Sequence, residues 1–317
     1  MKKVFILLFV ILLGTSAYGQ RHEVGLFLGT SFYIGDLNPS QPFLMSQPAF
    51  GAAYRYILNP RWAFKFNGYY GEVAGSDRNN PDASLRDRNL NFRSMVLEFG
   101  GMMEFNFMRF VAGSDHERFS PFLFGGLSVF RFNPRAEFNG DWYYLQPLGT
   151  EGQGTTAYPE RTPYSLTSVA IPFGIGIKYS WGENVVLGLE WGMRRTFTDY
   201  LDDVSSTYAD PYILWSENTP AAMIFGNRIN ENMIDDMNLN ISPEPGVGSH
   251  QDMSLYAESM YQYAGQQRGD ESTKDWYSFA GITITFQIRG PRATQCDAYR
   301  QHHHYKEYRR PGTRRRR

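Results

Sequence analysis

The chain has 317 residues, a net charge of −1, 16% aromatic residues and one cysteine, Cys296, which excludes a framework of internal disulfides. The near-neutral charge hides an asymmetry, because residues 291–317 carry nine Lys/Arg against two acidic residues, a net charge of +7. The mean hydropathy of −0.43 is typical of a soluble protein. It does not exclude a membrane barrel, in which only alternate strand residues touch lipid.

The N-terminus has the pattern of a secretory signal peptide. A basic head (MKK) precedes an apolar run over residues 4–13, and small residues follow at Ala17 and Gly19. We therefore predict a signal peptide over residues 1–19, cleaved before Gln20. No later apolar run approaches the 18 residues that a membrane-spanning helix needs. An exported chain of this kind is expected to be either soluble or a β-barrel.

Eight segments alternate large apolar residues with small or charged ones, which predicts extended strands with two different faces. The clearest is NVVLGLEWGMRRTFTDY at residues 184–200, where apolar residues at odd positions alternate with Gly, Glu and Arg. The fifth segment is apolar on both faces, so the pattern does not decide which of its residues face outward. The predicted strands are residues 22–35, 48–58, a third from Trp62, 90–107, 119–132, 167–180, 184–200 and 275–289.

The connections between these segments alternate in length. Those after the second, fourth and sixth strands are the shorter ones, a pattern typical of periplasmic turns opposite long extracellular loops. We predict an all-β fold: an eight-stranded antiparallel transmembrane β-barrel over residues 20–290 in the bacterial outer membrane, contacting its lipids. A soluble sandwich or lipocalin is the alternative, but it seldom sets so many large apolar residues against Gly and isolated charges. Predicted interfacial aromatics are Tyr33, Tyr56, Trp62, Tyr179, Trp181, Trp276 and Tyr277.

Several charged residues fall on the predicted inner face. Opposite charges can pair across so narrow a lumen and fill it, so we interpret them as a structural plug, with a selective pore or a catalytic site as the alternatives. No histidine lies in a strand beside a Ser or Asp partner, so we expect no enzyme activity and no cofactor. The predicted lumen charges are Lys65, Glu98, Glu104, Lys178, Glu190 and Arg194, with Arg93 as a weaker candidate.

Residues 199–274 form a long acidic connection in which the only basic residues are Arg228, Arg268 and Lys274. A segment of this length is unusual for a plain loop, and residues 254–267 are a candidate helix. Asp199, Asp202 and Asp203 lie close together and could bind Ca²⁺. Their spacing matches no EF-hand loop, so a solvated acidic turn is the favoured interpretation.

The basic tail, residues 291–317, is expected in the periplasm, since eight strands return the chain to the side where it began. A short basic arm can bind an acidic protein surface or anionic head groups, and the compartment argues against nucleic acid. Cys296 could bond a partner, although an idle thiol is equally consistent. The predicted partner-binding residues are Arg292, Cys296, Arg300, Lys306, Arg309 and Arg310.

Four runs give the chain a family resemblance. The sequence resembles the PorG-type outer-membrane proteins of the type IX secretion system over most of the barrel, although residues 212–267 and the four terminal arginines match nothing in that family. The most specific run is the last of the four. The runs are LGTSFYIGDLN (28–38), FRSMVLE (92–98), IPFGIGIKY (171–179) and LGLEWGMRRTFTDYLDD (187–203).

The resemblance implies a non-enzymatic barrel that ties a periplasmic ring of PorK and PorN to the outer membrane, and that is needed for protein export and gliding motility. The alternative is a stand-alone small barrel that acts as an adhesin or a narrow channel through its outer loops.

Overall fold

The computed structural model describes residues 22–80, 82–229 and 250–288. The predicted signal peptide (1–19) and basic tail (291–317) lie outside the described residues.

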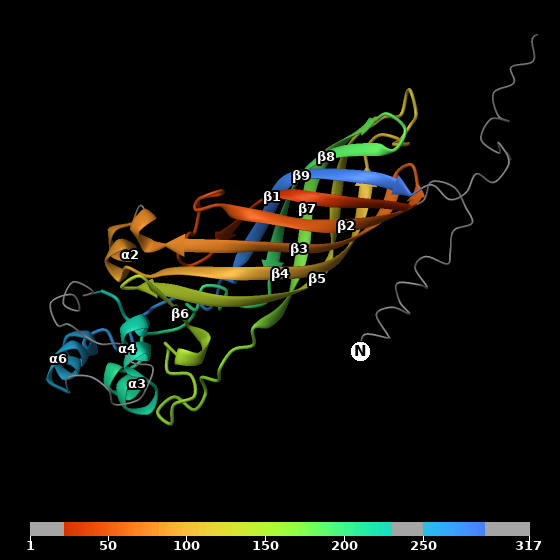
Figure 1. The fold of residues 1–317 in the computed structure, drawn as a ribbon. Coiled ribbons are helices and arrows are strands. Elements are labelled where there is room, and N and C mark those ends of the chain that lie inside the picture. Colours follow the sequence, from red (N-terminus) through yellow and green to blue (C-terminus); the bar gives the residue numbers. More distant parts are fainter. Residues whose placement is uncertain (1–21, 81, 230–249, 289–317) are drawn as a thin grey trace, which may run out of the picture. The chain divides into compact units, whose positions relative to one another are not determined.

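The described strands form one antiparallel sheet, and eight of them close into a barrel (Figure 1). The sheet runs β4-β3-β2-β1-β9-β8-β7-β5, and pairing of β4 with β5 closes it. The first and last strands also pair, in register from His22 opposite Ile288 to Ile34 opposite Trp276. The predicted closed, eight-stranded antiparallel barrel is confirmed. The barrel strands are β1 (His22–Ile34), β2 (Gln47–Asn59), β3 (Trp62–Ser76), β4 (Asn91–Asn106), β5 (Phe119–Phe138), β7 (Thr167–Trp181), β8 (Val185–Thr196) and β9 (Trp276–Ile288).

The barrel has two different ends. At one, which we call the turn end, β2–β3 and β7–β8 are joined by the shortest connections (60–61 and 182–184) and β4–β5 by residues 107–118. At the other, the loop end, β1–β2, β3–β4, β5–β7 and β8–β9 are joined by segments that carry all the described helices. The described chain begins at the turn end with His22 and returns there with Ile288, as an even number of strands requires.

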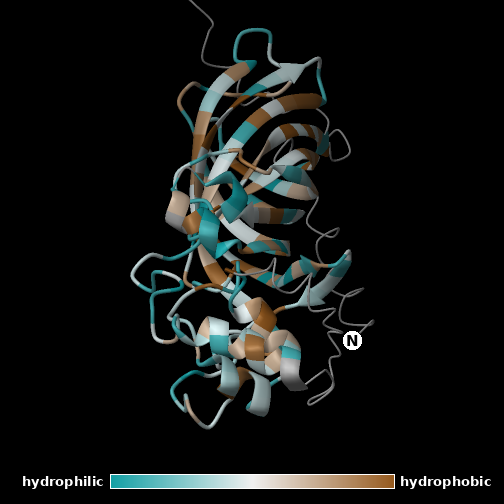
Figure 2. Cartoon of the chain, turned by 90° about the vertical axis from the view of Figure 1, so that its left-hand side faces the viewer, coloured by the Kyte–Doolittle hydropathy of each residue, from teal (hydrophilic) through white to brown (hydrophobic). Residues whose placement is uncertain are grey.

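The outer wall of the barrel is apolar. Leu26, Leu28 and Leu127 are 59%, 60% and 70% exposed, whereas Phe27, between the first two, is fully buried. Hydrophobic and hydrophilic residues alternate along the strands in Figure 2, as expected when successive side chains point to opposite faces. So large an exposed apolar surface is unfavourable in water and suits contact with lipid tails.

Aromatic side chains mark the turn end of this outer wall. Trp62 begins β3, Phe119 begins β5 and Trp181 ends β7, and all three are exposed. The prediction is wrong for Tyr33 and Tyr277, which are fully buried and point into the barrel. Both have the inward parity of their strands, and each hydroxyl contacts a buried carboxylate there.

Glycines on the inner wall make room for aromatic rings. Gly174 of β7 lies opposite Gly192 of β8. A Cβ at either position would lie 2.6 Å from the end of the Phe124 ring, far inside van der Waals contact. Larger residues at this pair would therefore displace the ring from the lumen.

The loop end contains more regular structure than the sequence analysis predicted. β5 continues to Phe138 and forms a hairpin with β6 (Asp141–Tyr144), where a loop was expected from Asn133. The described part of the acidic connection, residues 199–229 and 250–274, contains three helices, and α6 partly overlaps the predicted helix 254–267 but begins and ends earlier. Besides two 3-10 turns, η1 (Asp77–Asn79) and η2 (Gln146–Leu148), the described helices are α2 (Ala83–Arg88), α3 (Pro211–Glu217), α4 (Pro220–Gly226) and α6 (His250–Tyr261). None of the described helices is long and apolar enough to cross a membrane.

Helices α3, α4 and α6 form a cap with its own apolar core. Asp210 and Thr219 cap α3 and α4 by accepting hydrogen bonds from Tyr212 N and Ala222 N. Seven-residue helices are too short to be stable alone, so their packing must supply the stability. The buried core joins them to the β5–β6 hairpin through Ala136, Phe138, Leu145, Leu214, Ala221, Ala222, Met223, Ile224, Phe225, Met253, Tyr256, Ala257 and Met260.

Replacing Leu28 tests the lipid-facing assignment, since Leu28 lies in the middle of β1 on the outer wall. In lipid vesicles we expect Leu28→Arg to lower the free energy of unfolding by about 2–4 kcal/mol, because a charge near the bilayer midplane is poorly solvated. Leu58→Arg near the turn end is the matched control, with an expected cost of about 0–1 kcal/mol. Urea unfolding measures both, and equal costs would contradict the assignment.

Candidate functional site

The barrel interior holds a balanced group of four acidic and four basic side chains, here called the lumen cluster. It contains all six residues of the predicted lumen set, together with Glu23 and Arg55. Each member is at most 4% exposed. The members are Glu23, Glu98, Glu104, Glu190, Arg55, Lys65, Lys178 and Arg194.

The cluster is connected across the barrel toward the turn end. Arg55 Nε of β2 donates to Glu104 Oε2 of β4 over 3.0 Å, and Lys178 of β7 donates to the other oxygen of the same carboxylate. Lys65 Nζ of β3 lies 2.7 Å from both oxygens of Glu190 on β8. These pairs link strands on different sides of the barrel, so they hold the wall together through its centre.

A second group of contacts lies further toward the loop end. Arg194 Nε of β8 donates to Glu98 Oε2 of β4 over 3.0 Å. The same carboxylate accepts from Asn67 Nδ2 and from the Tyr277 hydroxyl, each over 2.7 Å. Its charge is thus matched by a guanidinium and its oxygens are solvated by protein donors in place of water.

Aromatic rings fill the lumen beyond the ion pairs. The Phe27 and Tyr69 rings stack with centroids 4.5 Å apart, and Phe279 meets both edge-on. These rings belong to an apolar core that continues to Leu201 and Val204. Paired charges and packed rings therefore occupy the interior, and the arrangement suits a plug better than a water-filled path.

The inner-face assignment was wrong for Arg93 and incomplete for two residues. Arg93 lies on the outer wall, 3.7 Å from Glu72 and with its guanidinium over the Trp142 ring. Arg55 and Glu23 were not predicted, although the alternation along their strands places both on the inner face. Arg55 lies between the outward Tyr54 and Tyr56, and Glu23 has the same parity as the buried Phe27. The predicted partner-binding residues Arg292, Cys296, Arg300, Lys306, Arg309 and Arg310 lie outside the described residues.

Several carboxyl groups lie close together where the chain leaves β8 for the cap, and they have fewer cationic partners than the carboxylates of the lumen cluster. The Tyr33 hydroxyl lies within hydrogen-bond distance of both Asp202 and Asp275 (3.0 Å to the latter), yet it has one proton to donate. Burial, together with neighbouring carboxylates, raises the pKa of Asp202 and of Asp275 well above the usual range. Burial also raises the pKa of Asp199 to about 7 and that of Asp203 to about 6.

The favoured interpretation, a solvated acidic turn, is wrong, because Asp199, Asp202 and Asp203 are at most 4% exposed. The alternative, a calcium site, gains no support from this geometry. Asp199 accepts from the Ser205 hydroxyl, and Asp203 accepts from Thr150 and Tyr164, so these side chains turn toward protein donors. Among residues 22–80, 82–229 and 250–288, no group of three or more His, Cys, Asp or Glu side chains has the geometry to hold a metal ion.

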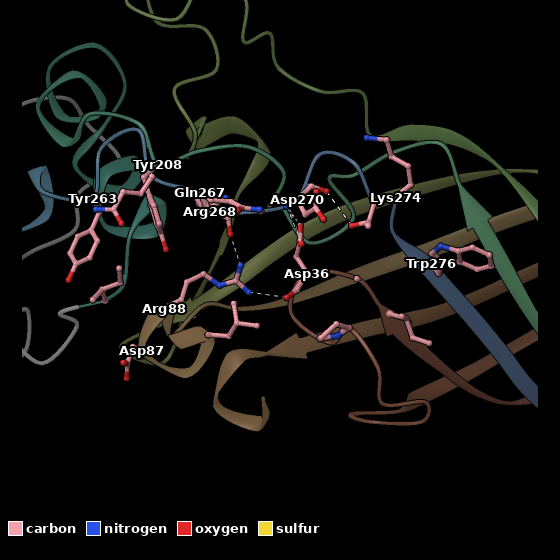
Figure 3. Close-up of a pocket in the computed structure, with 18 residues that line it drawn as sticks. Asp36, Asp87, Arg88, Tyr208, Tyr263, Gln267, Arg268, Asp270, Lys274 and Trp276 are labelled. Carbon is pink, nitrogen blue, oxygen red and sulfur yellow. Dashed lines mark hydrogen bonds between the residues drawn. The ribbon is translucent and has the colours of Figure 1, made fainter. Parts of the chain in front are cut away.

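A cavity of about 1070 Å³ opens beside these carboxylates, between the barrel rim, α2 and the cap (Figure 3). The rim contributes Asp36 and Trp276, α2 contributes Arg88, and the segment that follows α6 contributes Tyr263 and Arg268. Burial raises the pKa of the Asp36 carboxyl to about 6. Ligand pockets in proteins typically measure roughly 300–1,000 Å³, so this one is large enough for a peptide side chain and its neighbours.

A closed eight-stranded barrel with an apolar outer wall and a charge-filled lumen defines this chain as a membrane-type β-barrel protein. A family model described as "Domain of unknown function (DUF6089)" matches residues 2–233, and the chain belongs to that family.

Solved structures similar to this chain include three small barrels of low identity. Neisserial surface protein A is 9% identical, with a TM-score of 0.38, and the match covers 86% of this chain and all (100%) of that one. OprG of Pseudomonas aeruginosa is 9% identical, with a TM-score of 0.33, and the match covers 85% of this chain and 98% of that one. The N-terminal barrel domain of Pseudomonas aeruginosa OprF is 11% identical, with a TM-score of 0.30, and the match covers 85% of this chain and 100% of that one. None of these scores carries a conclusion about function, and a search of curated proteins gave no match.

Replacing Glu104 tests the lumen cluster. Glu104→Gln leaves Arg55 and Lys178 buried without their shared carboxylate, so we expect the free energy of unfolding to fall by about 3–5 kcal/mol. Glu117→Gln is the matched control, because its pair with Arg109 at 2.6 Å is exposed and contributes below about 1 kcal/mol. Urea unfolding in detergent measures both, and a Glu104 variant as stable as the control would show that the cluster does not hold the barrel.

The loop-end carboxyls predict a pH dependence for the cap. Their folded-state pKa values lie above those of the unfolded chain, so the folded cap binds protons more tightly and its stability falls as pH rises from 5 to 8. We expect a loss of about 1–2 kcal/mol, since Asp199 is partly screened by solvent and lies 3.8 Å from Lys274. Hydrogen exchange over residues 199–229 at pH 5 and pH 8, corrected for the intrinsic exchange rates, measures this loss of stability. Greater protection at pH 8 than at pH 5 would contradict the assignment, and Asp199→Asn should flatten the profile.

Proposed function

We propose that this chain is a non-conducting, non-enzymatic barrel of a bacterial outer membrane that acts as an attachment point. The lumen cluster supports this most directly, because a barrel whose interior is occupied by matched ion pairs has no open path for solutes. The apolar outer wall supports the membrane setting. The shorter connections at the turn end are those expected in the periplasm, with the cap outside.

Within this class we propose the more specific role of an anchor in a type IX secretion machine. The barrel would tie the periplasmic PorK/PorN ring to the outer membrane, with the turn end and the basic tail on the periplasmic side. Support comes from the four sequence runs, of which LGLEWGMRRTFTDYLDD is the most specific. The net charge of +7 over residues 291–317 would suit an acidic surface on the partner.

The second candidate is a stand-alone barrel that binds a ligand at the loop end, as an adhesin does. The ordered cap favours it, because an apolar core spanning α3, α4, α6 and the β5–β6 hairpin gives a fixed surface rather than a set of loose loops. A narrow channel, the other form of this candidate, is disfavoured by the filled lumen.

Affinity purification from outer membranes in mild detergent separates the two candidates. The anchor predicts that the full-length chain recovers ring subunits and that a chain cut after Gly290 recovers several-fold less, because the basic arm is gone. A matched control keeps the tail and neutralises its last four arginines to glutamine, which tests charge alone.

A chain that recovers no ring subunit, with or without its tail, would contradict the anchor. If a variant without α6 and residues 230–249 then also lost its binding to cell surfaces, the stand-alone adhesin would take its place.

A further inference from the structure

The loop-end cavity contains an acidic group that the protein leaves without a cationic partner. The Asp36 carboxylate accepts hydrogen bonds from one backbone donor, Asp270 N, at 3.2 and 3.3 Å. Among the described residues, no cationic nitrogen lies within ion-pair distance of it. A half-buried carboxylate in a large cavity thus has coordination capacity to spare.

The cations that line the cavity are already committed. Arg88 makes a two-point pair with Asp77 at 2.7 and 2.8 Å, and it also donates to the backbone oxygens of Asp36 and Arg268. Arg268 donates to Glu151 over 2.7 Å and to three backbone oxygens. Neither guanidinium is therefore available to bind an anion.

The third cation, Lys274, is also engaged. Its Nζ donates to Glu271 O over 2.9 Å and lies 3.8 Å from Asp199. Because all three cations that line the cavity are engaged elsewhere, the Asp36 carboxylate favours a cationic ligand over an anionic one.

Aromatic and amide groups complete the walls. Figure 3 shows Asp36 near the middle of the cavity, with Tyr208 and Tyr263 toward one end and Trp276 toward the other. The two tyrosine rings lie 6.3 Å apart. Aromatic faces attract cations and pack against the aliphatic stem of a basic side chain.

We propose that the loop-end cavity binds a basic peptide segment, with an arginine or lysine side chain paired to Asp36 and its stem packed against the aromatic walls. The committed arginines, the spare carboxylate and the aromatic lining each favour this chemistry. The assignment does not depend on the secretion role, since the cavity lies at the loop end and the anchor role is proposed for the turn end.

Binding is tested with the full-length barrel in detergent and a fluorescein-labelled peptide, Ala-Ala-Arg-Ala-Ala, by fluorescence anisotropy. The comparison peptide carries citrulline in place of arginine, which keeps the shape and removes the charge. We expect saturable binding of the arginine peptide and roughly tenfold to hundredfold weaker binding of the citrulline peptide, the range for losing a charged hydrogen bond. This comparison uses the unaltered protein, so folding of a variant does not enter it.

Asp36→Asn should weaken arginine-peptide binding by the same factor, because it removes the negative charge. The local structure should be kept, since asparagine can still accept from Asp270 N. Asp115→Asn, an exposed substitution in the turn-end connection, should leave binding unchanged. Equal affinity for the two peptides, no binding of either, or full binding by the Asp36 variant overturns the proposal. Recovery of ring subunits by the Asp36 variant should match that of the unaltered chain, which keeps this test separate from the anchor.

Discussion

Charges removed from water must be paired, and this constraint shapes the inside of the barrel. A buried carboxylate or ammonium without a partner costs several kcal/mol. Here four acidic and four basic side chains meet in the lumen, and Glu104 and Glu190 are each shared by two basic side chains, with Arg55 common to both. The pairs form only when strands on opposite sides of the barrel are in register, so the network and the closure of the sheet require each other.

The loop end follows a different rule. In the lumen every carboxylate has a cationic neighbour, whereas at the loop end Asp202 and Asp275 share one tyrosine proton and Asp36 has only a backbone donor. The lumen charges are thus paired, whereas Asp202, Asp275 and Asp36 make no ion pair among the described residues, and Asp36 lines a large cavity. Groups with strongly perturbed pKa values in a cavity are candidates for binding. These two arrangements agree with the proposal of a barrel that is filled at its centre and binds a ligand at its loop end.

The strand framework could be predicted because alternation is a local property. Parity alone orients residues such as Leu28 and Glu104, and it also orients Arg55, Tyr33 and Tyr277 inward. The two tyrosines were misplaced because a general expectation for aromatic residues at strand ends was set above the parity of their own strands. Arg93 shows the opposite error, since a charge was assumed to avoid the outer wall even though a carboxylate on a neighbouring strand can pair with it.

The cap and its cavity could not be predicted, because they depend on contacts between distant segments. α3 and α4 are too short to show a clear period, and their apolar residues are buried only against the β5–β6 hairpin and α6. The cavity combines Asp36, Arg88 and Arg268 from three connections. No spacing in the chain signals that these three residues meet.

The filled lumen is the claim on which the account depends, and planar-bilayer recording tests it most directly. The purified, refolded barrel should insert without unitary current steps at moderate voltage, with an open porin inserted under the same conditions as the positive control. Regular conductance steps from the unaltered protein would show a continuous water-filled path. Such steps would contradict both the packed interior and the attachment role built on it.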